Sequence, residues 1–123
     1  MSKNKAFFLK VNEAFATGNV DFIFENITED VQWHIVGESM IEGKNAVKKM
    51  LEPMRDVVAE EYVTENIITH GNIASIQGTM IMPNKAGQKR TFAFCDVYKL
   101  NKFKNGKIKE LTAYIIELNE SDV

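Results

Sequence analysis

The second half of the chain limits the possible folds most strongly. After Glu60, four long segments are rich in β-branched and aromatic residues, and the turn signals H-G-N, P-N-K-A-G and K-N-G separate them. This pattern predicts strands joined by short hairpins, which form an antiparallel meander. The predicted strands are Tyr62–Thr69, Ile73–Met82, Thr91–Leu100 and Ile108–Leu118, with an earlier strand at Val31–Val36.

The first half of the chain has the spacing of helices. Residues 3–17 carry an apolar stripe that follows one helical face. The stripe consists of Phe7, Val11, Ala14 and Phe15. Gly18 suits the left-handed position just past the end of a helix. Asn19 can then cap a short second helix through N-V-D-F-I-F-E-N-I.

A third helix is predicted after Gly43, and a proline lies inside it. Its apolar stripe consists of Val47, Met50, Leu51, Met54, Val57 and Val58. Pro53 removes one backbone hydrogen bond and clashes with the preceding turn. We therefore expect either a kink between Lys49 and Pro53 or two abutting helices.

The order of these elements predicts an α+β fold. A chain of 123 residues with 45% hydrophobic and 26% charged residues is typical of one globular domain, here spanning residues 1–123. Helix, helix, strand and helix precede four consecutive strands. The helices are therefore expected to gather on one face of a mostly antiparallel sheet.

Charge and patterning argue against several classes of partner. The net charge is −2, and most cations between Lys85 and Lys109 lie near turns, which predicts solvated hairpin tips and no nucleic-acid surface. The N-terminus lacks the apolar core of a signal peptide, and no run is long enough to span a membrane. We expect a cytoplasmic protein with neither a nucleic-acid nor a membrane partner.

The sequence has no pattern of metal ligands. Cys95 is the only cysteine, and the two histidines, His34 and His70, have no partner at metal-ligand spacing. His34 is expected to be structural, on the outer face of its strand or at an interface, and His70 to belong to a hairpin turn. We expect neither a metal nor a cofactor.

Several short motifs occur in an order that resembles a known family. They are F-A-T-G-N-V-D, then D-V-x-W-x-x-x-G from Asp30, then G-x-x-A-V from Gly43, and finally F-C-D-V-Y-K-L followed by N-G-K-I. Over nearly the whole chain they resemble the SnoaL-like, polyketide cyclase-related branch of the nuclear transport factor 2-like superfamily. Its members include ketosteroid isomerases and limonene epoxide hydrolases. The resemblance implies a cone-shaped, strongly curved sheet wrapped by three N-terminal helices around a pocket, and it implies this fold more strongly than any function.

The resemblance singles out Asp96, which matches the isomerase position that donates a hydrogen bond to the substrate oxygen. Because side chains alternate across a strand, an inward Asp96 places Phe92, Phe94 and Tyr98 inside as well. Asp96 is the candidate acid, and burial is expected to raise its pKa. Tyr98 is the first candidate for its companion, and a rotated His34 or Glu65 is the second. The alternative is a structural aspartate bonded to a neighbouring backbone group or tyrosine.

Alternation also assigns the apolar walls of the expected pocket. Trp33 shares the inner face of its strand, and the helices supply further apolar side chains that can close the space. The predicted ligand-binding residues are Phe15, Trp33, Ile35, Met54, Ile76, Met80, Phe92, Phe94, Ala113 and Ile115.

Other positions depart from the catalytic patterns of these relatives. The proton-shuttling aspartate of the isomerases aligns near Ile35, and the tyrosine that completes their oxyanion hole aligns near Val11. Ala113 stands where the cyclases carry an aspartate, and Phe94 where the epoxide hydrolases need an arginine. A separate acid and base are therefore not visible, and epoxide hydrolysis is not expected.

Three functions remain open. The first is a cofactor-independent isomerase, cyclase or dehydratase that acts on a small apolar carbonyl compound, with Asp96 as acid or hydrogen-bond donor. The second is a non-catalytic module that binds an apolar ligand, and the third is a protein-interaction domain. An aromatic lining favours the first two.

The outer sheet face is expected to form a homodimer, because it is too apolar to leave in water. That face consists of Ala93, Cys95, Val97, Thr112, Tyr114 and Ile116.

Overall fold

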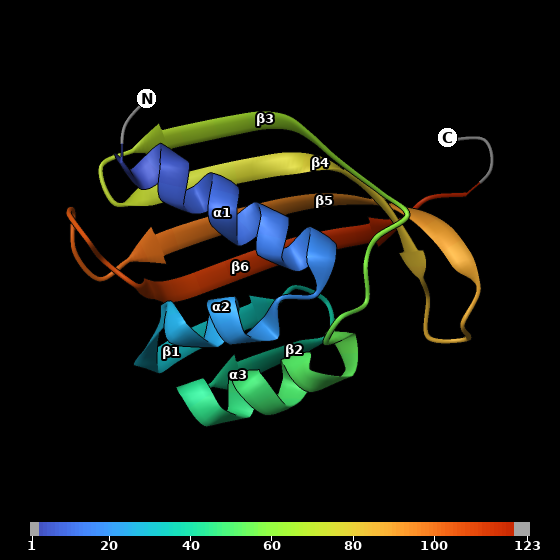
Figure 1. The fold of residues 1–123 in the computed structure, drawn as a ribbon, viewed down its shortest axis with the longest axis horizontal. Helices are drawn as coiled ribbons and strands as arrows, with labels where there is room; N and C mark the ends of the chain where they lie inside the picture. The colour runs from blue at the N-terminus through green and yellow to red at the C-terminus, as the bar shows by residue number, and fades with distance from the viewer. Residues whose placement is uncertain (1–2, 120–123) are drawn as a thin grey trace.

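The computed structural model describes residues 3–119 as three helices, a 3₁₀ turn and six strands (Figure 1). Residues 1–2 and 120–123 of the predicted domain lie outside the described part. The helices are α1 (Lys3–Thr17), α2 (Val20–Glu25) and α3 (Lys44–Leu51), and the 3₁₀ turn η1 (Glu52–Met54) follows α3 directly. The strands are β1 (Ile27–Ile35), β2 (Ser39–Glu42), β3 (Glu61–His70), β4 (Ile73–Pro83), β5 (Lys89–Leu100) and β6 (Ile108–Glu117).

The junction between α1 and α2 has the predicted chemistry. Gly18 has a φ of 68°, and a Cβ atom there would lie 2.5 Å from the carbonyl oxygen of Met54, so only glycine fits. The side chain of Asn19 accepts a hydrogen bond of 3.1 Å from the backbone N–H of Phe22 and caps α2. This tight turn brings the segment after η1 against the end of α1, where the N–H of Asp56 donates to the carbonyl oxygen of Gly18.

The third helix is shorter than predicted. α3 ends at Leu51, and Pro53 lies in η1, which is close to the predicted alternative of two abutting elements. Pro53 has no N–H group to continue the α-helical ladder, and the chain then turns through Asp56 at a φ of 59°. The placement of Val57 and Val58 on the helical stripe was therefore wrong, and Val58 is 66% exposed.

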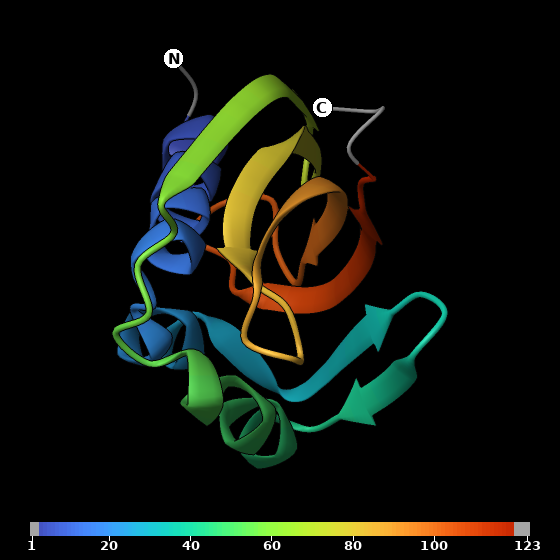
Figure 2. The same ribbon diagram turned by 90° about the vertical axis from the view of Figure 1, so that its right-hand side faces the viewer.

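The strands form one curved sheet in the order β2-β1-β6-β5-β4-β3. Neighbouring strands are antiparallel except β1 and β6, which run parallel. Figure 2 shows the sheet curling into an unclosed cone, with the helices on its concave side. This confirms the predicted α+β cone. The sequence did not indicate β2, because its four residues are mostly exposed and carry no apolar alternation.

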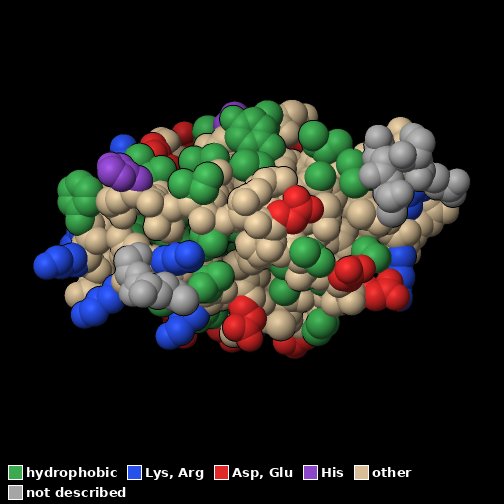
Figure 3. All heavy atoms as spheres, turned by 90° about the horizontal axis from the view of Figure 1, so that it is seen from above, with side chains coloured by type: hydrophobic (Ala, Val, Ile, Leu, Met, Phe, Trp, Pro, Cys, Tyr) green, Lys and Arg blue, Asp and Glu red, His purple; other side chains and the backbone are tan. Residues whose placement is uncertain are grey.

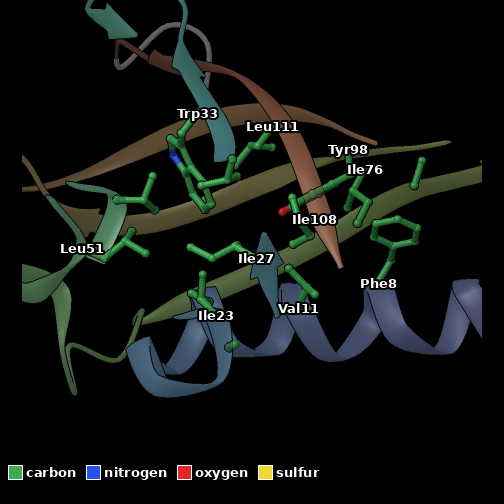
Figure 4. Close-up of a cluster of buried hydrophobic side chains, with 14 of the residues drawn as sticks. Phe8, Val11, Ile23, Ile27, Trp33, Leu51, Ile76, Tyr98, Ile108 and Leu111 are labelled. Atoms are coloured by element: carbon green, nitrogen blue, oxygen red, sulfur yellow. The ribbon is translucent and has the colours of Figure 1, made fainter. Parts of the chain in front are cut away.

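The core lies between the concave face and helices α1 and α2 (Figure 4). Phe8 and Val11 of α1 are fully buried, and the ring centroid of Phe8 lies 5.3 Å from that of Tyr98. The buried side chain of Asn12 donates a hydrogen bond to the hydroxyl oxygen of Thr64, which ties α1 to β3. This end of the cone is therefore filled with packed side chains.

Candidate functional site

A cavity of about 200 Å³ lies between the concave face of the sheet and the segment formed by α3 and η1. Five strands and α1 build its wall, and methionine and leucine side chains of α3 and η1 cover it. The lining is almost entirely apolar, which is typical of a site for a small organic ligand. The lining residues are Phe15, Trp33, Ile35, Met50, Leu51, Met54, Tyr62, Met80, Met82, Phe94, Asp96, Leu111, Ala113 and Ile115.

Asp96 is the one carboxyl group among the described residues that line this cavity. The residue is 7% exposed, and no hydrogen bond or ion pair from residues 3–119 reaches its carboxyl group. The alternative of a structural aspartate bonded to a neighbour is therefore not observed. Burial raises the pKa of Asp96 from 3.8 to about 7, the predicted direction, because the carboxylate loses water without gaining a partner. Near neutral pH the group can both donate and accept a proton.

Tyr62 is a second polar group in the wall, which the sequence analysis did not select. Its ring lies 5.1 Å from that of Phe94, centroid to centroid, and it is the cross-strand partner of Met80. Burial, and then the negative charge of nearby Asp96, raise the pKa of Tyr62 above its ordinary value, so its hydroxyl stays neutral. Counting back from the hairpin turn would have placed Tyr62 on the outer face, because a β-bulge between Thr64 and Asn66 shifts the pairing with β4 by one residue.

Trp33 forms the wall on the β1 side, as its alternation predicted. It is 3% exposed, and its ring centroid lies 5.9 Å from that of Phe15, which projects from α1. Figure 4 shows Trp33 and Leu51 at one end of the buried cluster, with Phe8 and Ile76 at the other. Trp33 thus stands at the boundary between the packed core and the cavity.

Three of the predicted ligand-contact or catalytic residues face inward but do not line the cavity. Ile76 and Tyr98 are fully buried in the packed core. Phe92 lines a neighbouring groove. The hydroxyl of Tyr98 is buried without a hydrogen-bond partner among the described residues, so Tyr98 is not a companion of Asp96 at the cavity wall. Alternation gave the correct face for these residues, but it carries no information on depth along the cone.

Four methionines form much of the cavity wall. Met50 and Met54 cover it from α3 and η1, and Met80 and Met82 line it from β4. Of these, the sequence analysis selected Met54 and Met80 for ligand contact. Unbranched thioether side chains adapt their shape at little cost, so this wall can fit closely around an apolar ligand.

The β1–β2 and β4–β5 hairpins lie next to the cavity; in Figure 2 the β1–β2 hairpin projects to the right and the β4–β5 hairpin lies in front. A groove of about 590 Å³ runs between these hairpins, and Ile35 and Ile115 line both the groove and the cavity. Glu38 and Lys85, one from each hairpin, form an ion pair of 3.1 Å across the groove. These shared residues mark the groove as the mouth of the cavity.

The other polar candidates lie away from the cavity. His34 is on the outer face, opposite Met40 and Thr112 on the adjacent strands, as predicted. Glu65 is exposed and accepts a hydrogen bond of 3.3 Å from the side-chain amide of Gln77.

Residues 3–119 contain no cluster of three or more potential metal ligands. Within the same range, no helix is long and apolar enough to cross a membrane.

The opposite end of the molecule carries the exposed lysines of the β5–β6 turn. Lys102, Lys104 and Lys107 are exposed there, as predicted for a hairpin tip, and Figure 3 shows lysines gathered at this end. A second groove of about 590 Å³ at this end runs past Phe103, which is 70% exposed. Its lining is more polar than that of the cavity beside Asp96.

Comparisons with known proteins agree with this geometry. The crystal structure of an NTF2-like protein of unknown function from Cytophaga hutchinsonii has 26% sequence identity and a TM-score of 0.67, and the match covers 89% of this chain and 96% of that one. A similarly described protein from Burkholderia xenovorans has 16% identity and a TM-score of 0.71, and covers 96% of this chain and 87% of that one, a likeness of fold alone. No curated protein matches the chain.

The family model for the SnoaL-like domain matches residues 8–111, which include α1 from Phe8 onward, the segment formed by α3 and η1, and every cavity residue except Ala113 and Ile115 on β6. The curved sheet with its helices is the architecture that the chain shares with these neighbours. The chain therefore belongs to the SnoaL-like domain family, within the NTF2-like superfamily.

Proposed function

We propose that the cavity binds a small apolar carbonyl compound and that protonated Asp96 donates a hydrogen bond to its oxygen. The observation that carries this proposal is an unpartnered, buried carboxyl group at the wall of an otherwise apolar cavity. A carboxyl group without a partner is costly to bury, so a ligand that supplies a hydrogen-bond acceptor would relieve that cost. Tyr62 provides a second neutral donor in the same wall.

As an enzyme, the protein would catalyse a proton transfer of the isomerase, cyclase or dehydratase kind without a cofactor. Asp96 would pass its proton to the carbonyl oxygen, and the resulting carboxylate would then remove a proton from the neighbouring carbon. The products are an enol and a protonated Asp96, so atoms and charges balance. A pKa of about 7 suits a group that must hold and release a proton near neutral pH.

The binding proposal is tested with Asp96→Asn, which keeps the shape of the side chain and removes acid–base capacity. We would titrate wild type and variant with a cyclic ketone at pH 6 and pH 8.5, following the emission of Trp33, the only tryptophan. Wild-type affinity should fall as pH rises through about 7 because the donor is lost, whereas the variant should show no such change. Asp30→Asn, at an exposed carboxylate on β1, is the matched control. Equal pH dependence in all three proteins would refute the role of Asp96.

The catalytic form of the proposal needs a separate measurement. In deuterated buffer, wild type should exchange the protons next to the ketone carbonyl faster than Asp96→Asn does, as NMR would record. Binding without such a difference in exchange would support the second function, a non-catalytic ligand-binding module. The wall of the cavity is the same in both cases, so the exchange rate alone separates them.

We further propose a homodimer through the outer sheet face of β5 and β6. On this face Val97, Tyr114 and Ile116 are 36%, 47% and 62% exposed, and their neighbours across the strands are uncharged. An apolar surface of this kind gains free energy when a second copy covers it. Light scattering at micromolar concentration should give twice the 14.0 kDa chain mass, and Ile116→Lys should give the single mass. A monomer mass for the wild-type chain would contradict this proposal.

A further inference from the structure

The size of the cavity limits what it can hold. Its volume of about 200 Å³ is small for a ligand site, since pockets for drug-sized molecules are roughly 300–1,000 Å³. An apolar protein cavity of roughly 150 Å³ holds one benzene molecule. The space beside Asp96 therefore matches one substituted ring, and a fused four-ring skeleton exceeds it.

The packed core prevents the cavity from extending further into the cone. Ile76 is the cross-strand partner of Asp96 and is fully buried, and so is Tyr98, two residues further along β5. Phe8 packs against Tyr98 from the helix side. A longer ligand cannot move these residues without opening the core, so extra rings could extend only toward the mouth.

The mouth carries no uncompensated positive charge among the residues that the structure describes. Each cation of the β4–β5 hairpin has an acidic partner: Lys85 with Glu38 at 3.1 Å, Lys89 with Glu60 at 3.7 Å and Arg90 with Glu117 at 3.9 Å. A substrate tethered to a carrier through phosphate groups needs free cations where the tether leaves the site. The charges at this mouth instead suit a neutral molecule that enters free.

From these observations we infer that the ligand is a free, neutral, single-ring carbonyl compound. The inference rests on the proposed function and adds to it the size and charge of the substrate class. The ring occupies the methionine-lined space, its carbonyl oxygen faces Asp96, and the groove between the two hairpins serves for entry.

The test compares three ketones and one thioester on the wild-type chain at pH 6. The ketones are 3-methylcyclohex-2-enone with one ring, 1-tetralone with two and a tetracyclic steroid ketone, and the thioester is benzoyl-coenzyme A. Calorimetry and Trp33 emission should give at least tenfold tighter binding of the one-ring ketone than of the tetracyclic ketone or the thioester. Tighter binding of either large ligand would overturn the inference and leave the proposed function standing. Failure of every ligand to bind would refute the proposed function itself.

Two variants locate the size limit in the cavity. Ala113→Leu fills the space opposite Asp96, its cross-strand partner, and should weaken binding of the one-ring ketone at least tenfold. Met54→Ala enlarges the cavity and should improve the affinity for 1-tetralone relative to the one-ring ketone about fivefold or more. Met40→Ala, at a methionine that is 52% exposed on β2, is the matched control and should change neither affinity. If Met54→Ala and Met40→Ala give the same ratio, the size limit is not set by this wall, whether or not Ala113→Leu folds.

Discussion

The same strands run along both ends of the concave sheet face, but one end is filled with packed side chains and the other borders a cavity. At the end where α1 begins, Phe8 of the helix packs over Tyr98, and both side chains are fully buried. Toward the hairpin end, the cover is α3 and η1, and Asp96 borders an open space. Asp96 and Tyr98 are two residues apart on one face of β5, yet one lies at a candidate site and the other in packed core. Because both residues belong to the same strand, the helical element that covers each of them decides whether it borders the cavity or the packed core.

The largest effect should come from the filled end. Phe8→Ala removes a fully buried ring and leaves a void that the neighbouring strands cannot close, so it should lower the free energy of unfolding by about 3–5 kcal/mol. Phe103→Ala, at a phenylalanine that is 70% exposed, should change it by less than about 0.5 kcal/mol. Urea denaturation measures both. Similar losses in the two variants would show that this end is not a packed core.

At the end with the cavity, Asp96 should make the free energy of unfolding depend on pH. Between pH 3.8 and about 7 the folded chain keeps a proton on Asp96 that the unfolded chain has released, so wild-type stability falls as pH rises through this range. Between pH 5 and pH 8 this loss should amount to roughly 2–3 kcal/mol. Asp96→Asn should remove that part of the slope, whereas Asp30→Asn should retain it. Parallel stability curves for all three proteins would mean that Asp96 is ionised at every pH tested.

A smaller effect is expected at Tyr98. Its hydroxyl is buried without a hydrogen-bond partner among the described residues. Tyr98→Phe removes that unsatisfied group and should raise the free energy of unfolding by about 1 kcal/mol. Ligand affinity should stay within twofold of wild type, because Tyr98 does not line the cavity. A loss of affinity here would place the boundary of the site deeper in the cone.

The smallest change in stability is expected at Tyr62, the tyrosine of the open end. Tyr62→Phe keeps the ring that packs against Phe94, so the free energy of unfolding should change by less than about 0.5 kcal/mol. Ligand affinity should nevertheless fall several-fold, because one of the two neutral donors is lost. Thermal denaturation and calorimetry on Tyr62→Phe and Tyr98→Phe together form the sharpest comparison of the two ends. If ligand affinity instead fell in Tyr98→Phe and stayed unchanged in Tyr62→Phe, Tyr98 would be the residue that contacts the ligand.

Local patterns in the sequence predicted most of the fold. Turn signals separated the four long strands, and Gly18 and Asn19 marked the junction of the first two helices. The elements that were missed or misjudged lack a local signal of their own. β2 is held only by pairing with β1, and α3 ends because Pro53 lacks an N–H and the chain turns back onto α1.

The sequence by itself determined which face of β1, β4, β5 and β6 looks inward, because alternation depends only on neighbouring residues. It therefore placed Asp96 and Trp33 inside correctly, and with them Ile76 and Tyr98. Only the tertiary structure decided which of these residues meet a cavity. That outcome depends on Phe8 filling one end of the cone and the methionines of α3 and η1 covering the other, and these residues lie tens of positions away in the chain. The volume left between them follows from packing across the whole molecule, which no local pattern encodes.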